Sequence, residues 1–346
     1  QWAAQSGNRL ISQGEICVIF GYNHAAMPIK PAFKAQIDHV SILDESGKFD
    51  EKLGKDLIPD KDAVRLYEHM AVCRHLDEVA FKLQRSGRMG TYPQNMGQEA
   101  TSLGAAYALR KDDWMVTCYR ENAGLFWRGL PMEHILLHWM GDERGNQIPD
   151  GLNVTPISIP IGTQMLHAAG LAWAAKYQKK DSLACTFFGD GATSEGDFHE
   201  ALNLAAVWNL PVIFVVENNG YAESTSVEWA VAPLSYVDPA TGFGMPGVRV
   251  DGTDFFAVYE AAGEVIRRAR EGGGPSLLEC KMIRFYGHFE GDAQTYRGKG
   301  EVEEIRANKD CIKLFQARVK EVGVIAQAEF DKIDREVLDQ IEMAVV

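Results

Sequence analysis

A long run of helical periodicity begins at Asp60, directly after a proline, and stops before Ser86-Gly87. Hydrophobic residues in this run recur every three to four positions, which places them on one face of a helix. They are Ala63, Leu66, Tyr67, Met70, Leu76, Val79 and Leu83. The same reasoning predicts four further helices, over residues 98–109, 131–141, 162–179 and 255–270.

Short, uninterrupted hydrophobic runs predict strands between these helices. Residues 183–188 and 211–216 have the continuous hydrophobic character of strands that are buried on both faces of a parallel sheet. The helix predicted between them has an apolar face, and Ser194 to Asp197 match the capping pattern expected at its start. Further strands are expected at residues 114–117, 248–250 and 276–281. The alternation predicts an α/β fold with a mostly parallel sheet flanked by helices and a right-handed crossover.

Residues 1–58 show few periodic stretches, and we interpret them as an N-terminal arm or extension. Residues 59–346 are interpreted as one α/β domain that ends in a helical segment. The sequence begins with Gln1 and not with methionine, so we expect the natural start to lie upstream.

Composition excludes some classes of protein. The net charge of -13 opposes binding to nucleic acids or anionic membranes through a basic surface. No hydrophobic run approaches the roughly 18 residues that a membrane span needs, so we expect a cytoplasmic protein. The six cysteines are widely scattered without a C-x-x-C pair, which indicates reduced thiols, several of them in the core.

Polar residues follow the two buried strands at the points where they end. Gly189-Asp190-Gly191 follows the first strand, and Asn218-Asn219 follows the second. Since parallel strands present their carboxyl ends at one edge of a sheet, Asp190 and Asn219 are expected to lie close together. A carboxylate and an amide oxygen are ligands that suit Mg²⁺, which also takes phosphate oxygens.

Gly-Asp-Gly followed by Asn-Asn after one strand–helix–strand unit resembles the thiamine diphosphate fingerprint. The chain resembles the alpha subunit of the decarboxylating first component of 2-oxo acid dehydrogenases, from about Leu66 to Arg318. The resemblance implies a thiamine-diphosphate-binding fold, with Mg²⁺ held by Asp190, Asn219 and the backbone carbonyl of Tyr221. Backbone at Gly189, Gly191 and Ala192 would approach the cofactor.

Three more motifs agree with this resemblance. "CYRENAG" resembles the family's Tyr-Arg pair, which implies that Tyr119 and Arg120 hold the diphosphate. "SIPIGTQ" resembles the segment along the aminopyrimidine, which implies contacts from Ile161 and Gly162. "IRFYGHFEGDAQTYR" resembles the family's mobile loop. It implies that His288 is catalytic and binds the cofactor, with Arg284 beside it.

Other residues near these motifs are weaker candidates. His134 and His138 have helical spacing that could suit a metal, but a structural role is favoured. His199 and Glu200 lie beside the fingerprint on a helix that mainly packs. Tyr92 is a candidate wall of the substrate pocket, with plain packing favoured. Phe289 replaces the regulatory serine of mitochondrial pyruvate dehydrogenases, so phosphorylation at this position is excluded.

The resemblance also implies partners. The carboxylate that activates the cofactor comes from a beta subunit in this family, and we find no candidate for it here. We therefore expect a heterotetramer of two alpha and two beta chains, which passes an acyl group to a lipoyl-bearing acyltransferase core.

Of three alternatives for the substrate, we expect pyruvate, with acetoin second. "LQRSGRMGTYPQNMGQEA" and the long N-terminal region favour pyruvate, whereas "GHFEGDAQTYR" is more similar to acetoin dehydrogenase alpha chains. A branched 2-oxo acid is the third alternative.

Two further possibilities are disfavoured. A non-catalytic scaffold does not need the intact site residues, and a self-contained carboligase of the acetolactate-synthase type has a longer chain.

Overall fold

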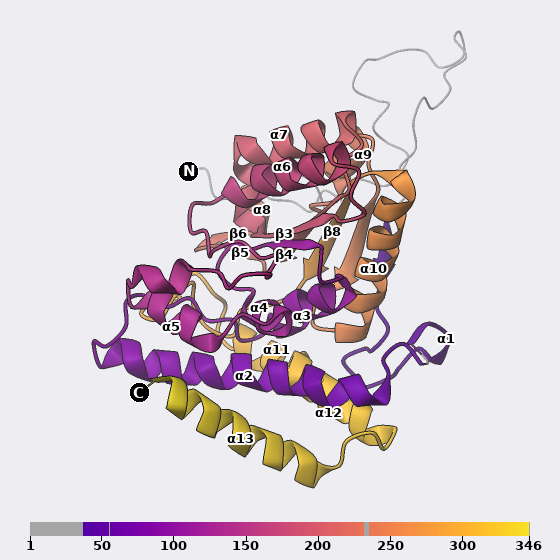
Figure 1. The fold of residues 1–346 in the computed structure, drawn as a ribbon. Helices are drawn as coiled ribbons and strands as arrows, with labels where there is room; N and C mark the ends of the chain where they lie inside the picture. Colours follow the sequence, from indigo (N-terminus) through magenta and orange to yellow (C-terminus); the bar gives the residue numbers. More distant parts are fainter. Residues whose placement is uncertain (1–36, 55, 232–234, 346) are drawn as a thin grey trace, which may run out of the picture. The chain divides into compact units, whose positions relative to one another are not determined.

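A six-stranded parallel sheet lies at the centre of the fold (Figure 1). The computed structural model describes residues 37–54, 56–231 and 235–345. The strand order is β1-β7-β8-β4-β3-β2, and each neighbouring pair is parallel. The strands are β1 (Asp38–Val40), β2 (Trp114–Val116), β3 (Ala184–Gly189), β4 (Val212–Asn218), β7 (Gly247–Asp251) and β8 (Ser276–Lys281). A separate antiparallel hairpin pairs β5 (Tyr221–Ala222) with β6 (Thr225–Ser226). The predicted α/β fold with a mostly parallel sheet is confirmed.

Helices flank this sheet. They are α1 (Glu51–Gly54), α2 (Asp60–Arg85), α3 (Glu99–Ala108), α4 (Asn122–Arg128), α5 (Met132–Trp139), α6 (Thr163–Tyr177), α7 (Gly196–Val207), α8 (Val227–Ala230), α9 (Asp238–Gly242), α10 (Phe255–Arg268), α11 (Glu301–Asn308), α12 (Cys311–Glu321) and α13 (Gln327–Val345). Short helical turns of other types occur at η2 (Glu143–Asn146), η3 (Asp190–Ser194) and η4 (Ala269–Gly273).

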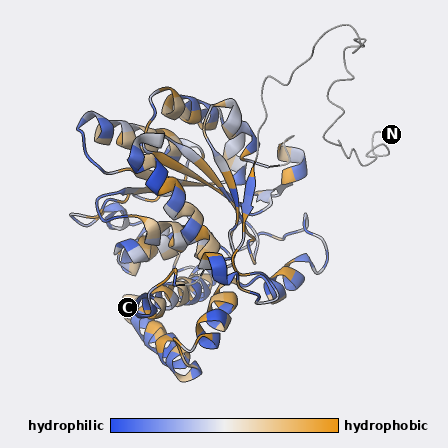
Figure 2. Cartoon of the chain, turned by 90° about the vertical axis from the view of Figure 1, so that its right-hand side faces the viewer, coloured by the Kyte–Doolittle hydropathy of each residue, from blue (hydrophilic) through white to orange (hydrophobic). Residues whose placement is uncertain are grey.

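Both faces of the central strands β3 and β4 are buried, because their side chains alternate between two hydrophobic clusters. In β3, Cys185 and Phe187 belong to one cluster, and Ala184 and Phe188 belong to the other. The first cluster also contains residues of α2, α3, α4, α10, α12 and α13, and the second contains residues of α6, α7 and α9. The strands of the sheet are accordingly largely hydrophobic (Figure 2). This double coverage closes the faces of β3 and β4 to a ligand and leaves the ends of these strands accessible.

Part of the predicted N-terminal arm belongs to the same compact unit as the α/β domain, which extends from Ile37 to Val346. Strand β1 pairs with β7 at the edge of the sheet. The backbone N–H groups of Ile42 and Leu43 both donate to Asp254 Oδ2 at 2.6 Å. The unit thus begins before residue 59, where the hydrophobic pattern placed its start. The rest of the predicted arm, residues 1–36, lies outside the described residues.

The predicted capping box at Ser194 is wrong. Residues 190–194 form the turn η3, and α7 begins at Gly196 with Glu195 as its N-cap and no side-chain cap. The turn uses Thr193, whose hydroxyl donates to the Asp190 carbonyl at 2.8 Å. An extra turn between strand and helix displaced the start of the helix from the position that the motif predicted.

The cysteines and the length of the hydrophobic helices agree with the expectations from composition, as far as the described residues go. Five cysteines, namely Cys73, Cys118, Cys185, Cys280 and Cys311, are free and buried, as predicted. Cys17 lies outside the described part of the chain. None of the helices that the structure describes is both long enough and hydrophobic enough to cross a membrane.

We predict that Asp254→Asn lowers the free energy of unfolding by about 2 kcal/mol. Asp254 is fully buried and accepts N–H groups from Ile42, Leu43, Phe256 and Ala257. An asparagine NH₂ would face two of these donors. Urea unfolding followed by circular dichroism measures the change. Asp339→Asn, at an exposed position of α13, is the control, with an expected change below about 0.5 kcal/mol. Equal effects of the two substitutions would contradict this account.

Candidate active site

One pocket lies where β3 and β4 end, and segments that follow β2 and β8 complete its wall. Every site residue predicted from sequence lines it, except Gly162. The lining residues are Gln98, Cys118, Tyr119, Arg120, Glu121, Ile161, Gln164, Gly189, Asp190, Gly191, Ala192, Glu195, Glu217, Asn219, Tyr221, Ala222, Glu223, Arg284 and His288. Segments that are far apart in the sequence therefore converge at one edge of the sheet.

Asp190 and Asn219 face this pocket because β3 and β4 end in register, with Gly189 opposite Glu217. Asp190 is 1% exposed, and its Oδ2 is buried without a hydrogen-bond partner. Burial raises the pKa of this carboxyl to about 6, which the nearby Arg284 opposes. The Asn219 Nδ2 donates to Gln98 Oε1 at 3.0 Å, which fixes the orientation of the amide.

These residues fit a bound divalent cation. A buried carboxylate oxygen without a partner is costly, and a metal ion would satisfy it. The described residues contain no group of three or more His, Cys, Asp or Glu residues that could hold a metal. A site built from Asp190, Asn219 and the Tyr221 carbonyl has one carboxylate, so it would need ligand oxygens from elsewhere. Mg²⁺ commonly takes these oxygens from phosphates.

Two buried guanidinium groups supply the positive charge of the pocket. Arg120 is 7% exposed and Arg284 is 1% exposed. Among the described residues, neither forms an ion pair with a carboxylate. Arg120 donates to the Gln94 carbonyl at 3.1 Å, and Arg284 donates to the Glu223 carbonyl at 2.8 Å. Burial and the neighbouring Arg120 lower the pKa of Arg284 to about 10. Buried cations without anionic partners suit an anionic ligand such as a diphosphate.

His288 lies between the two arginines, and they determine its tautomer. Arg284 Nη1 is 2.8 Å from His288 Nδ1, and Arg120 Nη2 is 3.4 Å from the same atom. Arg120 also donates to the backbone carbonyl of His288. Because a guanidinium can only donate, Nδ1 accepts and the neutral ring carries its proton on Nε2. Burial and the two guanidiniums lower the pKa of His288 to about 3.

Two buried acids, Glu121 and Glu217, line the pocket and were not predicted. Burial raises the pKa of Glu121 to about 7, and burial together with Glu121 raises the pKa of Glu217 well above its usual range. Such a pair retains a proton and carries less than its full negative charge. An anion can therefore bind nearby at lower electrostatic cost. Their signal in the sequence was their position at the ends of strands, beside Arg120 and Asn219.

Two glycines near the pocket, Gly191 and Gly162, have different structural roles. A Cβ on Gly191 would lie 2.8 Å from the Ala222 Cβ, so this glycine lets the β5 hairpin approach η3. Gly162 has a φ of 90° at the N-cap of α6 and does not line the pocket, although a Cβ there would lie 3.4 Å from the Cβ of Glu195, which does. A left-handed turn there presents Ile161, which is 43% exposed, at the pocket.

Several weaker candidates lie outside the pocket. His138 Nδ1 pairs with Asn146 Oδ1 at 2.8 Å, which is a structural contact between α5 and η2. His199 and Glu200 are exposed on α7 and do not line the pocket. Tyr92 is fully buried and donates to Asp77 Oδ1 at 2.7 Å, in keeping with the packing role favoured from sequence.

Gln98 lines the pocket without any distinctive motif of its own, within the segment "NMGQEA". Gln164 lines it as well, and its Nε2 donates to the Ser158 carbonyl at 2.7 Å. Gln98 accepts a hydrogen bond from Asn219, and Gln164 holds the segment that precedes Ile161. Such contacts depend on the folded chain, so no local pattern reports them.

We predict that His288 stays neutral from about pH 8 to about pH 5. An unfolded histidine binds its proton near pH 6.5. The lowered pKa therefore contributes stability that is present above about pH 6.5 and is lost as the pH falls toward about 3. Ring ¹⁵N signals, assigned with His288→Asn, should not move over this pH range. A midpoint near pH 6.5 would contradict the geometry.

Comparisons with known proteins identify the family. A family model described as "Dehydrogenase E1 component" matches residues 67–346. The alpha subunit of acetoin:2,6-dichlorophenolindophenol oxidoreductase from Cupriavidus necator is 53% identical over 260 residues, which cover 72% of this chain and 78% of the relative.

Two other relatives are named for 2-oxo acid substrates. The 3-methyl-2-oxobutanoate dehydrogenase subunit alpha of Mycobacterium tuberculosis is 43% identical over 276 residues, covering 78% of this chain and 74% of the relative. The pyruvate dehydrogenase E1 component subunit alpha of Acholeplasma laidlawii is 38% identical over 300 residues, covering 86% and 87%. The chain therefore belongs to the dehydrogenase E1 component family, as an alpha subunit of its thiamine-diphosphate-dependent enzymes.

Proposed function

We propose that this chain supplies the diphosphate- and metal-binding half of an active site that cleaves the carbon–carbon bond beside a ketone carbonyl, with acetoin as substrate. The observation that carries the proposal is that one pocket holds both positive groups and a carboxylate oxygen that are not neutralised by the described residues. Within the part of the chain that the structure describes, Arg120 and Arg284 are buried without carboxylate partners, and Asp190 has a buried oxygen without a hydrogen-bond partner. A magnesium diphosphate group would satisfy both.

Each part of the cofactor has residues to receive it. Asp190, Asn219 and the Tyr221 carbonyl would hold Mg²⁺, and Tyr119 and Arg120 would hold the diphosphate. Ile161 would contact the aminopyrimidine end, and Gly162 would shape the turn that presents it. The backbone of Gly189, Gly191 and Ala192 would line the diphosphate.

Thiamine diphosphate supplies the carbanion chemistry when it is bound. The chain's own contribution is charge, orientation and one placed proton. Arg284 holds His288 through Nδ1, so that the Nε2–H can donate to an oxygen of the ligand. His288 and Arg284 are thus the residues that we propose act at the reacting end.

We assign the carboxylate that activates the cofactor to a beta subunit, in a heterotetramer of two alpha and two beta chains. The family implies a beta subunit and an acyltransferase core as partners. A lipoyl group on that core would receive the acyl group. A scaffold without activity is disfavoured, because a scaffold has no use for two buried cations that have no carboxylate partner among the described residues.

Acetoin is favoured over pyruvate by two observations. The relative named for acetoin shares 53% identity with this chain, against 38% for a relative named for pyruvate. The loop that carries His288 also resembles acetoin dehydrogenases. Pyruvate, which the N-terminal half of the sequence favours, is the second candidate, and a branched 2-oxo acid is the third.

We predict that Asp190→Asn weakens thiamine diphosphate binding in the presence of Mg²⁺ by at least about tenfold. The substitution keeps the volume of the side chain and removes the charge that would bind the metal. Isothermal titration of the alpha–beta complex measures the affinity. Asp339→Asn, exposed on α13, is the control and should bind as the wild type does. An unchanged affinity in Asp190→Asn would refute the metal assignment.

The substrate is tested with the chain purified together with its beta subunit. Reduction of 2,6-dichlorophenolindophenol is followed with acetoin, pyruvate and 3-methyl-2-oxobutanoate in parallel. We expect kcat/KM for acetoin to exceed that for either acid by at least about tenfold, corresponding to about 1.4 kcal/mol of transition-state discrimination. A preference for pyruvate would show that the N-terminal half, and not the His288 loop, reports the substrate.

A further inference from the structure

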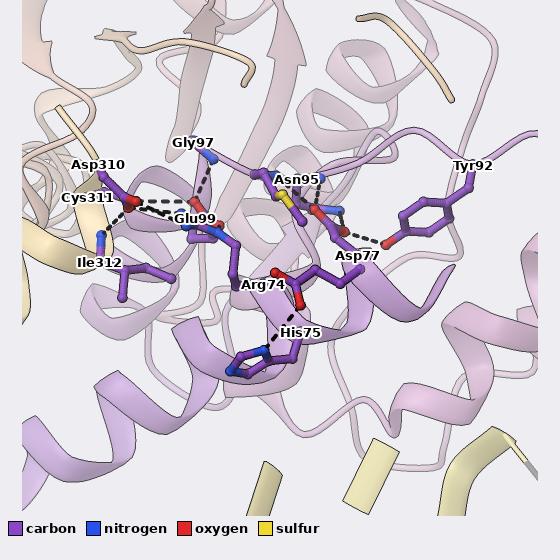
Figure 3. A network of polar contacts seen from close by, with 12 residues as sticks. Arg74, His75, Asp77, Tyr92, Asn95, Gly97, Glu99, Asp310, Cys311 and Ile312 are labelled. Carbon is purple, nitrogen blue, oxygen red and sulfur yellow. Dashed lines mark hydrogen bonds and ion pairs between the residues drawn. The ribbon is translucent and has the colours of Figure 1, made fainter. Parts of the chain in front are cut away.

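Helix α2 carries a buried acid, Asp77, that none of the site assignments uses. Asp77 is fully buried and is surrounded by donors from the segment that connects α2 to α3. Figure 3 shows this network beside a second one, centred on Glu99. We refer to residues 92–98 as the connecting segment.

Asp77 holds the connecting segment through four hydrogen bonds. Its Oδ1 accepts from Tyr92 Oη at 2.7 Å and from Asn95 Nδ2 at 3.3 Å. Its Oδ2 accepts the backbone N–H groups of Asn95 at 2.6 Å and Met96 at 2.8 Å (Figure 3). All four donors belong to the connecting segment, so one carboxylate sets its path.

The far end of the connecting segment is held by Glu99. Glu99 Oε2 accepts the Gly97 N–H at 2.8 Å, and its Oε1 accepts from Arg74 Nε at 2.6 Å. Gly97 has a φ of 94°, and a Cβ there would clash with the Ile283 carbonyl. Helix α2 thus fixes both ends of the segment, since Arg74 and Asp77 lie one turn apart.

The connecting segment in turn contacts the cationic residues of the pocket. The Gln94 carbonyl accepts from Arg120 Nε at 3.1 Å, and the Gln94 Nε2 donates to the Gly287 carbonyl at 2.6 Å. Asn95 Oδ1 accepts the N–H of Asn122, two residues after Arg120, at 3.1 Å.

The segment also pairs with the loop that carries Arg284 and His288. The Phe285 N–H donates to the Met96 carbonyl at 3.1 Å, and the Glu290 N–H donates to the Tyr92 carbonyl at 3.2 Å. These bonds lie on either side of His288. The metal side of the pocket is reached as well, because Gln98 Oε1 accepts from Asn219 Nδ2.

We infer that Asp77 is a positioning residue for the cofactor pocket: through the connecting segment it holds Arg120 and the His288 loop in the places where they meet the diphosphate. Asp77 itself does not line the pocket. Its effect on the cofactor rests on the proposed function, whereas its effect on the loop does not.

The test uses the alpha–beta complex with Asp77→Asn. An asparagine NH₂ would face two of the four donors, which loosens the connecting segment. Without cofactor, we expect hydrogen exchange of peptides covering residues 284–291 to become at least about tenfold faster. With Mg²⁺, we expect the dissociation constant of thiamine diphosphate to rise by at least about tenfold.

Asp254→Asn is the matched control. Asp254 is also fully buried, also accepts four hydrogen bonds, and does not line the pocket. It should lose stability while exchange at residues 284–291 and the dissociation constant stay within about twofold of wild type. If Asp77→Asn behaves like this control in both measurements, the inference is overturned.

Two further outcomes are informative. If the wild type does not bind thiamine diphosphate, the proposed function fails, and the exchange experiment alone decides the role of Asp77. If Asp77→Asn does not fold, Tyr92→Phe replaces it, since this change removes one donor and leaves the other three. Faster exchange at residues 284–291 in Tyr92→Phe supports the inference, and wild-type exchange overturns it.

Discussion

The parallel pairing of β3 with β4 is the constraint on which the pocket depends. Both strands are buried on both faces, and their ends are in register, with Gly189 opposite Glu217. Because a one-residue slip would turn every side chain to the other face, the two hydrophobic clusters hold this register. Asp190 and Asn219 follow as a consequence, since each is the residue that leaves the sheet just beyond the paired region. The segments after β2 and β8 then supply the cations at the same edge.

The pocket holds positive charge that the described part of the chain does not neutralise. Arg120 and Arg284 lie in one pocket with a neutral histidine between them, and burial together with their mutual repulsion lowers the pKa of Arg284. Holding like charges together requires rigid support, and the connecting segment provides it through backbone carbonyls and Gln94. The buried acids Glu121 and Glu217 retain a proton and so add little negative charge. The result is a site prepared for an anion before the anion arrives.

The sequence predicts the features that depend on local pattern. Continuous hydrophobic runs identify β3 and β4, and parallel strands must end at one edge, so Asp190 and Asn219 are found without the structure. Features that depend on distant contacts are missed. Strand β1 has three residues, of which two are exposed, so no hydrophobic alternation marks it. Asp77 stands next to Leu76 on a long helix, where an acid ordinarily faces solvent, and only the fold of residues 92–98 shows that it is buried.

The central claim is that Asp190 and Asn219 share a metal ion at the end of β3 and β4. The most direct measurement is anomalous diffraction from crystals of the alpha–beta complex grown with thiamine diphosphate and Mn²⁺ in place of Mg²⁺. The account predicts one Mn²⁺ peak within about 2.2 Å of an Asp190 carboxylate oxygen and the Asn219 amide oxygen, with diphosphate oxygens completing the shell. A peak bound by other residues, or a cofactor bound without metal at this position, would contradict it.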